Sequence, residues 1–432
     1  MPTTSTALLT DRYELTMVDA ALRVGIGSRR SVFEVFTRSL PPGRRYGVVA
    51  GTGRLLEHLQ NFRFGPAELD WLRKQQLVSD DTLAWLEAYR FSGSIRGYRE
   101  GELFFAGSPV LVVEAPFAEA VLLETIALSV LNYDSAVASA AARMVSAAEG
   151  RPIAEMGSRR TGERGAVAAA RAAYLAGFAA TSNLEAGRAW GVPTMGTAAH
   201  AFTLLFDREE DAFRAQVDAM GVGTTLLVDT YEIPDAVETA VRVAGTALGS
   251  VRIDSGDLAL LAAEVRAQLD GLGATGTHII VTNDLDEYAI EALQSAPIDS
   301  FGVGTAVATG SGAPAAGFVY KLAAHLDDDG TWMPVGKRSA EKATIAGRKQ
   351  PVRALRDGVA DAEHVYVEEA PVEGIGRELL VDLVVDGEPV DWALGPEGVL
   401  AARIHHAAAI SELPREARSL IPGDPAIPTV YF

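Results

Sequence analysis

Between residues 151 and 308, short apolar runs alternate with stretches long enough to form helices. The apolar runs are RPIAEMGSRR, GFAATSN, GVPTMGTAAH, TTLLVDT, SVRIDSGD, HIIVTND and SFGVGTAV. Alanine-rich or amphipathic stretches separate most of them, at residues 163–176, 207–220, 234–248, 257–270 and 286–296. This spacing is typical of βαβ units with a parallel sheet. It favours a closed or nearly closed (β/α) barrel, with a doubly wound open sheet as the alternative.

The whole chain is therefore expected to be an α/β protein with three parts. Residues 1–125 mix short strand-like and helix-like pieces with Gly/Pro turns, and predict an N-terminal α/β domain. Residues 126–325 hold the irregular (β/α) barrel. Residues 326–432 form a C-terminal extension with a basic loop, KRSAEKATIAGRKQ, and short alternating strands.

Composition excludes several classes of function. A net charge of −19 argues against general binding to nucleic acid or to an anionic membrane. The absence of cysteine excludes disulfides, thiolate catalysis and cysteine–zinc sites. The first residues, MPTTSTALLTDRYELTMVDAAL, have neither a basic start nor an unbroken apolar core. We therefore expect no signal peptide and a cytoplasmic protein that does not enter a membrane.

Polar side chains gather at the carboxyl end of each apolar run. In a barrel these ends meet on one face, where the loops form the site. Helix capping is the plain alternative, and Ser255 or Asp257 could cap the helix expected at 257–270. Capping does not explain Arg159, Arg252 or His200. The side chains concerned are Ser158, Arg159, Arg160, Thr181, Ser182, Asn183, Thr197, His200, Asp229, Arg252, Asp254, Ser255, Asp257, Asn283, Asp284, Gly304 and Thr305.

The stretch SFGVGTAVATGSGAP places a Gly-rich turn after the last apolar strand. Such a turn can bring backbone N–H groups close to a phosphate, although a tight turn without a ligand is the commoner explanation. Carboxylates beside a phosphate site suit Mg²⁺, which binds through one or two carboxylates and substrate phosphates. Asp229 or Asp254 is the expected contact to such an ion; no dedicated all-protein metal site is expected.

Eleven ordered motifs give the chain a wider resemblance. They are LLTDRYELTMVDAAL, FEVFTRSLPPGRRYGVVAG, EMGSRRT, GFAATSNLEAG, MGTAAHAF, LLVDTYE, VRIDSGDL, VTNDLDE, FGVGTAVAT, VYKL and KRSAEKATIAGRKQ, and they run to about residue 350. In this order they resemble the nicotinate phosphoribosyltransferases. Residues 351–432 add little to the likeness.

The resemblance implies a reaction and an architecture. Nicotinate, 5-phosphoribosyl 1-diphosphate, ATP and water would give nicotinate mononucleotide, diphosphate, ADP and phosphate. This is pentosyltransferase chemistry in an ATP-dependent enzyme classed as a ligase, and it is the entry step for salvage of nicotinic acid into NAD. The family fold is that of the type II phosphoribosyltransferases, and members are commonly homodimers with the active site near the subunit interface.

The family's phosphorylated histidine corresponds to His200, in GTAAH. A neutral imidazole is a competent nucleophile, and phosphohistidine is labile enough for its hydrolysis to drive another step. Without the other motifs, a histidine packed at a helix start would be the simpler interpretation. Ala201 departs from the serine that is frequent there.

The resemblance carries other roles over by position. Tyr13, Thr197 and Arg252 would contact nicotinate, with the arginine on its carboxylate. Thr305 and Gly304 would contact phosphoribosyl diphosphate. Arg159 would hold phosphate, and Asp229, Asp254 and Asp284 would hold ribose hydroxyls or Mg²⁺. The residues expected to meet ATP or diphosphate are Lys321, Lys337 and Lys342.

Three alternatives stay open at this point. A related type II enzyme could act on nicotinamide or quinolinate. A barrel isomerase or aldolase could bind sugar phosphates, although no Schiff-base lysine is evident at a strand end. A catalytically silent homologue could keep the scaffold and leave His200 unphosphorylated.

Overall fold

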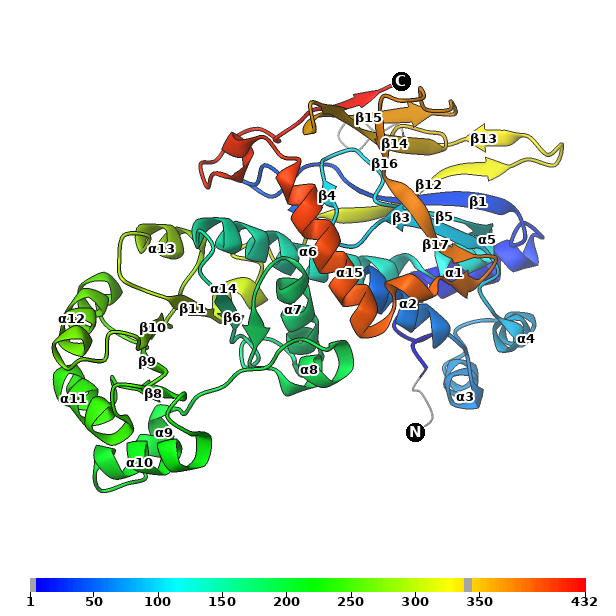
Figure 1. Ribbon diagram of the computed structural model, residues 1–432. Helices are drawn as coiled ribbons and strands as arrows, with labels where there is room; N and C mark the ends of the chain where they lie inside the picture. The colour runs from blue at the N-terminus through cyan, green and yellow to red at the C-terminus, as the bar shows by residue number, and fades with distance from the viewer. Residues whose placement is uncertain (1–4, 338–343) are drawn as a thin grey trace. The chain divides into compact units, whose positions relative to one another are not determined.

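The structure is a computed structural model, and it describes residues 5–337 and 344–432. The chain folds into two compact units (Figure 1). Unit 1 comprises Met1–Ser139 and Ala313–Phe432, and unit 2 comprises Ala140–Gly312. The N-terminal and C-terminal segments thus share one unit, and the expected three-part division at 125 and 325 stays a prediction. No helix within the described ranges is long and apolar enough to cross a membrane.

Unit 2 contains one parallel six-stranded sheet in the order β7-β6-β11-β10-β9-β8. Its strands are β6 (Ile153–Glu155), β7 (Ala180–Thr181), β8 (Thr225–Leu227), β9 (Ser250–Ile253), β10 (His278–Val281) and β11 (Ser300–Val303). Its helices are α7 (Glu163–Leu175), α8 (Leu184–Trp190), α9 (His200–Thr203), α10 (Glu209–Met220), α11 (Ile233–Ala244), α12 (Leu258–Gly271), α13 (Glu287–Ala292) and α14 (Thr305–Ala308). Figure 1 shows α10, α11, α12 and α13 along the outer side of the sheet.

The expected irregular barrel is confirmed as a curled, open half-barrel. Five expected helices are present close to their expected bounds, as α7, α10, α11, α12 and α13. The run GVPTMGTAAH was expected to be a strand, but it forms only a single parallel bridge between Thr194 and Thr181. Pro193 has no N–H to donate to a ladder, which explains the missing strand. The sheet consequently ends at β7 and β8 within the described chain.

Unit 1 is built on a seven-stranded sheet in the order β13-β12-β1-β5-β3-β17-β18. These strands are β1 (Arg30–Thr37), β3 (Ser94–Tyr98), β5 (Leu111–Pro116), β12 (Phe318–Leu326), β13 (Trp332–Pro334), β17 (Leu380–Val385) and β18 (Glu388–Pro389). A four-stranded sheet comprises β14 (Lys349–Arg356), β15 (Val359–Val367), β16 (Gly376–Glu378) and β19 (Thr429–Tyr431), and a two-stranded one β2 (Gly47–Val48) and β4 (Leu103–Phe104).

The helices of unit 1 are α1 (Arg12–Arg23), α2 (Thr52–Gln60), α3 (Pro66–Lys74), α4 (Asp80–Ala88), α5 (Phe117–Val121) and α15 (Gly395–Ser411), with short 3₁₀ turns η1 (Asp391–Ala393) and η2 (Arg415–Arg418). The boundary between the units falls within α6 (Glu124–Ala147). The core of unit 1 is apolar and includes Val32, Val35, Leu56 and Leu86, all nearly inaccessible to solvent.

A buried ionic network joins the strands of unit 1. The Arg353 guanidinium is fully buried and donates to Glu363 Oε2 at 2.6 Å and to the Leu103 carbonyl at 2.9 Å. Arg377 Nη1 donates to Glu102 Oε2 at 2.6 Å. Burial opposes ionisation of Glu102, but His405, Arg353 and Arg377 together hold its pKa well below the usual range. Because each charge is paired, the network stabilises the fold only as an intact set.

His406 on α15 makes the stability of unit 1 depend on pH. Burial lowers its pKa from 6.5 to about 4, and its Nδ1 lies 3.0 Å from the Gly101 carbonyl. Below pH 6.5 the unfolded chain binds a proton that the folded chain does not bind until about pH 4. We therefore expect this group to remove stability as pH falls through that window, by about 3 kcal/mol in all.

The test compares denaturant unfolding of wild type and His406→Asn from pH 7.5 to pH 4. Asparagine keeps a donor for the Gly101 carbonyl but does not titrate. The difference in unfolding free energy between the two proteins should change steadily as pH falls from 6.5 and should level off near pH 4. A difference that stays constant across this range would contradict the assignment.

Candidate active site

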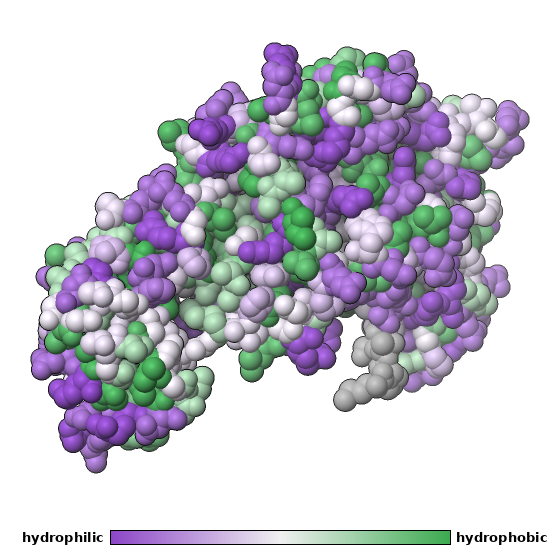
Figure 2. Space-filling model, in the orientation of Figure 1, coloured by the Kyte–Doolittle hydropathy of each residue, from purple (hydrophilic) through white to green (hydrophobic). Residues whose placement is uncertain are grey.

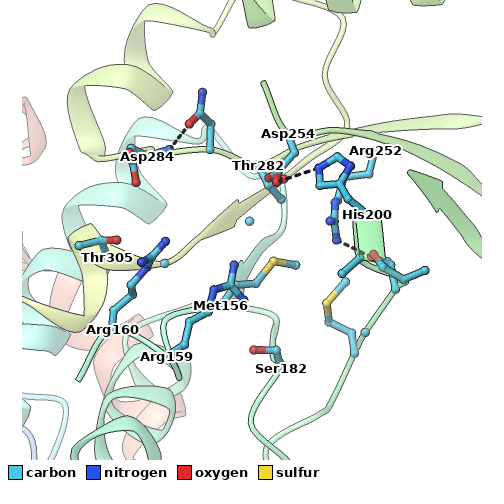
Figure 3. Close-up of a pocket in the computed structure, with 18 residues that line it drawn as sticks. Met156, Arg159, Arg160, Ser182, His200, Arg252, Asp254, Thr282, Asp284 and Thr305 are labelled. Atoms are coloured by element: carbon cyan, nitrogen blue, oxygen red, sulfur yellow. Dashed lines mark hydrogen bonds and ion pairs between the residues drawn. The ribbon is translucent and has the colours of Figure 1, made fainter. Parts of the chain in front are cut away.

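A cavity of about 460 Å³ opens at the carboxyl ends of the strands of unit 2. Figure 3 shows its side chains converging from several loops. The residues that line it are Met156, Arg159, Arg160, Ser182, Met195, Gly196, Thr197, Ala198, Ala199, His200, Arg252, Asp254, Thr282, Asn283, Asp284, Gly302, Gly304 and Thr305. All belong to unit 2.

Glycines allow the strand ends to approach one another closely. A Cβ on Gly302 would lie 2.5 Å from Thr282 Cγ2 and 2.8 Å from Met156 Sδ. A Cβ on Gly157 would lie 2.8 Å from the Gly304 carbonyl oxygen. Separations under 3 Å are not tolerated, so glycine at these two positions sets how near the loops after β6, β10 and β11 can come.

His200 stands at the start of α9 with its imidazole partly exposed to the cavity. Its Nδ1 lies 3.1 Å from the Thr230 hydroxyl oxygen. Its Nε2 lies 3.9 Å from Asp229 Oδ1 and 3.8 Å from Asp254 Oδ2. One ring nitrogen thus faces a hydroxyl, and the other faces two carboxylates.

The two carboxylates near His200 differ in exposure. The Asp229 side chain is only 2% exposed and does not line the cavity. Its Oδ2 accepts hydrogen bonds from the Asp254 backbone N–H and the Ser255 hydroxyl, each at 2.8 Å, while its Oδ1 finds no hydrogen-bond partner in the part of the chain that the structure describes. Asp254 Oδ1 accepts a hydrogen bond from the Thr282 hydroxyl, and its Oδ2 is left facing the ring. Asp229 therefore holds the loop after β9, and Asp254 reaches the cavity.

Arg252 projects from β9 and donates through Nη1 to the Thr197 hydroxyl. Burial lowers its pKa, and the nearby Arg159 adds to that effect, whereas Asp254 and Asp229 oppose it. Its Nε is buried and has no hydrogen-bond partner among the described residues. A guanidinium with unused donors beside a hydroxyl is suited to bind a planar carboxylate.

The opposite side of the cavity is suited to phosphate. Gly304 and Thr305 follow β11, and Arg159 and Arg160 follow β6. Within the described part of the chain, neither arginine forms an ion pair with a carboxylate. Their charge is therefore available to a ligand, together with the backbone of a Gly-containing turn.

Several known proteins are similar to this chain in both sequence and fold. Residues 8–132 match the family model of the nicotinate phosphoribosyltransferase (NAPRTase) N-terminal domain. The nicotinate phosphoribosyltransferase pncB1 of Mycobacterium tuberculosis is 54% identical over 98% of this chain and 94% of its own. The nicotinate phosphoribosyltransferase of Bacillus subtilis is 37% identical over 84% of this chain and 76% of its own. The chain belongs to the nicotinate phosphoribosyltransferase family.

A solved structure agrees with this family membership. The crystal structure of human nicotinic acid phosphoribosyltransferase superposes with a TM-score of 0.82 at 26% identity, covering 98% of this chain and 97% of that one. Membership of the nicotinate phosphoribosyltransferase family sets aside the barrel isomerase or aldolase considered from the sequence.

The cavity collects eight of the residues that the sequence indicated for this family. They are Arg159, Thr197, His200, Arg252, Asp254, Asp284, Gly304 and Thr305. Asp229 lies behind the wall rather than in it. Tyr13 lies on α1 in unit 1 with its side chain partly exposed, and burial raises its pKa to about 12, with Glu124 and Glu14 adding to the rise. Its contact with the pyridine stays a prediction.

The basic residues expected to meet ATP or diphosphate are more scattered. Lys321 on β12 of unit 1 lies 3.7 Å from Glu124 and donates to its neighbour's carbonyl oxygen at 2.7 Å. Lys337 is exposed, and Lys342 lies outside the described residues. Their proposed contacts stay predictions.

Sequence reasoning missed several side chains around the cavity, Met195, Ala198 and Ala199 among them. Met156 and Thr282 line it, and Thr230 contacts His200. Each directly follows a residue that ends a strand or a residue that was itself singled out, so position was an available signal. The residue types themselves gave no signal, since methionine is common in a hydrophobic core and threonine is common at a helix cap.

Asn283 carries backbone strain at the cavity wall. Its φ is 147°, a region almost confined to glycine, and its side-chain oxygen accepts the Asp284 N–H at 2.8 Å. Asn283→Gly should remove the strain and lose the hydrogen bond. Asn283→Ala should lose the bond and keep the strain, and we expect it to be less stable than the glycine variant by about 1 kcal/mol.

Urea unfolding of the two variants and wild type measures this order. Asn61→Ala in unit 1 serves as a control for loss of an asparagine at a position with negative φ. An alanine variant at 283 as stable as the glycine variant would show that the backbone relaxes there without cost.

Proposed function

We propose that this chain transfers the phosphoribosyl group of 5-phosphoribosyl 1-diphosphate to nicotinate, and that ATP drives the reaction by phosphorylating His200. The observation that carries the proposal is the layout of one cavity. Arg252 with Thr197 lies on one side, Arg159 and Thr305 lie on another, and the imidazole of His200 at the edge faces two carboxylates through Nε2. Family membership supports the substrates.

Nicotinate would bind with its carboxylate on Arg252. The Nη donors that Thr197 does not take up can pair with a carboxylate, and Thr197 holds the guanidinium in place, whereas Nε is buried. The neutral amide of nicotinamide offers only one acceptor oxygen and no charge, so it would bind more weakly here.

Transfer itself needs positioning more than acid or base. The nicotinate ring nitrogen attacks the anomeric carbon, a C–N bond forms, and the bond from that carbon to the diphosphate oxygen breaks. The electron pair leaves with diphosphate, and the ring nitrogen needs no deprotonation. Arg159, Arg160 and the backbone at Gly304 would stabilise the departing charge.

His200 has surroundings that suit a phosphoryl acceptor. Two carboxylates near Nε2 favour the tautomer with its proton on that nitrogen, which leaves the lone pair on Nδ1. Attack by Nδ1 on the γ-phosphorus of ATP would form an N–P bond and release ADP. Water would later cleave that bond, giving phosphate and the original imidazole, and the carboxylates would stabilise the ring while it is cationic.

Mg²⁺ fits this cavity as a partner of the substrate phosphates. The described residues hold no cluster of three or more His, Asp or Glu side chains able to bind a metal by themselves. Asp254 and Asp284 line the cavity and offer oxygen ligands, whereas Asp229 is withdrawn behind the wall. When bound, Mg²⁺ would neutralise charge on diphosphate, which is how it usually binds such sites.

We also propose that the protein acts as a homodimer. Figure 2 shows green hydrophobic groups among hydrophilic ones over the lower part of unit 2. Exposed apolar side chains at the ends of α9 and α10 include Leu204, Leu205 and Met220, each at least 60% exposed. Apolar surface of this kind commonly marks an interface. Sedimentation of the purified chain at a mass near 45.6 kDa would count against a dimer.

His200→Ala should remove the effect of ATP. We expect nicotinate mononucleotide formation to persist at a low rate, to respond no longer to ATP, and to proceed without ADP release. Incubation with γ-labelled ATP should label wild type in an acid-labile form and leave the variant unlabelled. As a control, His278→Ala removes an exposed histidine at the amino end of β10, opposite to the end that faces the cavity. This variant should be labelled like wild type.

The same assay addresses the remaining alternatives. An unchanged ATP dependence in His200→Ala would contradict the coupling role. Wild-type protein that forms neither product nor label would indicate a silent homologue. Comparable use of nicotinate, nicotinamide and quinolinate would contradict the role of Arg252.

Arg252→Gln should weaken nicotinate selectively. Loss of a charge-assisted pair costs about 1.5–3 kcal/mol, so the KM for nicotinate should rise roughly 10-fold to 100-fold while the weaker use of nicotinamide changes little. Arg188→Gln removes an exposed arginine of α8 and should leave both values unchanged. If Arg252→Gln weakens the use of nicotinate and nicotinamide equally, Arg252 supports the fold and does not bind the carboxylate.

A further inference from the structure

Glu155 is a buried carboxylate that the proposed chemistry does not use. It is the last residue of β6, is 0% exposed, and does not line the cavity. Burial raises its pKa, an effect opposed by hydrogen bonds from Thr181 and Gly157. A buried acid lowers stability unless its oxygens are satisfied, so an apolar residue would be the simpler choice at this position.

Both carboxylate oxygens of Glu155 hold loops that reach the cavity. Oε1 accepts the Gly157 backbone N–H in the loop after β6, and Oε2 accepts the Thr181 hydroxyl at 2.6 Å at the end of β7. The Glu155 carbonyl oxygen also accepts the Ser182 N–H at 2.8 Å. A single side chain therefore bridges two neighbouring strand ends.

The first of these loops carries the phosphate-binding arginines. Gly157 is two residues before Arg159, and its carbonyl oxygen accepts the Arg160 N–H at 2.8 Å. The loop is also joined to the β7 side, because Asn183 Nδ2 donates to the Ser158 hydroxyl at 3.0 Å. Fixing the Gly157 N–H thus fixes the start of the turn that presents both guanidinium groups.

The second connection leads toward His200. The Thr181 N–H donates to the Pro193 carbonyl, and the Met195 N–H donates to the Thr181 carbonyl, both at 2.9 Å. Met195 begins the segment that lines the cavity as far as His200. Because this segment has only a bridge at Thr194 and no strand of its own, Thr181 is its main anchor to the sheet.

We propose that Glu155 is a positioning residue that sets the geometry of the phosphate side of the cavity by tying the Gly157 turn to Thr181. The proposal rests on the proposed phosphoribosyl transfer. Glu155 touches no substrate; it acts through Arg159 and Arg160, whose placement determines how tightly 5-phosphoribosyl 1-diphosphate is held.

Near-isosteric substitutions test the proposal. Glu155→Gln keeps one acceptor oxygen but presents an NH₂ group to the second donor. Thr181→Val changes the volume little and removes the hydroxyl, which donates to Glu155 and accepts the Asn183 N–H at 3.0 Å. We expect the KM for 5-phosphoribosyl 1-diphosphate to rise about tenfold in each, with a smaller change in kcat. The double variant should be no worse than the poorer single one, because both changes break the same link. Thr181→Ser, which keeps the hydroxyl, should behave like wild type.

Two control variants separate positioning from stability and from charge. Val265→Ala creates a buried defect on α12, away from the cavity, and should lower the Tm by a few degrees while leaving the KM unchanged. Glu264→Gln removes the same charge from the exposed face of that helix and should change neither value.

Titration calorimetry with 5-phosphoribosyl 1-diphosphate gives a second measurement that does not need turnover. The binding constants of Glu155→Gln and Thr181→Val should weaken in parallel with their KM values. If wild type binds and turns over 5-phosphoribosyl 1-diphosphate normally, and both variants have binding constants and KM values within twofold of it, the positioning role is overturned and the proposed function is not. If the variants differ from wild type only in a lower Tm, Glu155 stabilises the fold and does not position the arginines. A wild type unable to bind this probe would overturn the proposed function and the inference together.

Discussion

Parallel hydrogen bonding between β6, β11, β10 and β9 determines where the chemistry of this protein can be. The pairs Val303–Glu155, Val281–Phe301 and Val281–Ile253 bring the ends of four strands to within two residues of one another in register. Each strand is then followed at once by a residue of the cavity wall. A shift of register by one residue would turn those side chains to the other face of the sheet, so the backbone pairing is the constraint on which the site depends.

The cavity gathers charges of both signs within a strongly acidic chain. Three arginines, Arg159, Arg160 and Arg252, line it, whereas Asp254 and the withdrawn Asp229 lie close to His200. A net charge of −19 would repel anionic substrates at long range, but screening limits that effect to about 8 Å at physiological ionic strength. Within the cavity the local arginines are the nearest charges. Composition therefore excluded nucleic acid without excluding phosphates.

Periodicity predicted the architecture of unit 2 well because its helices repeat a clear pattern. The stretch expected at 163–176 is α7, Glu163–Leu175, and its alanines are buried. The open edge of the sheet was missed although Pro193 signals it in the sequence, because which strands lie at the edge depends on pairing that is not local. Ordered motifs predicted eight cavity residues. Glu155 was missed because an acid at the end of a strand resembles a cap until the fold shows that it is buried.

Buried polar groups serve different purposes in the two units. In unit 1, Arg353 and Glu363 pair strand to strand, and a well-packed apolar pair could replace them with little loss of stability. In unit 2, Glu155 and Asp229 accept hydrogen bonds from loop backbone and hydroxyl groups, which no apolar side chain can do. Loops have few backbone partners of their own, so their geometry must come from side chains beneath them. Carboxylates beneath the strand ends therefore hold these loops in the fixed geometry that the proposed phosphoribosyl transfer requires.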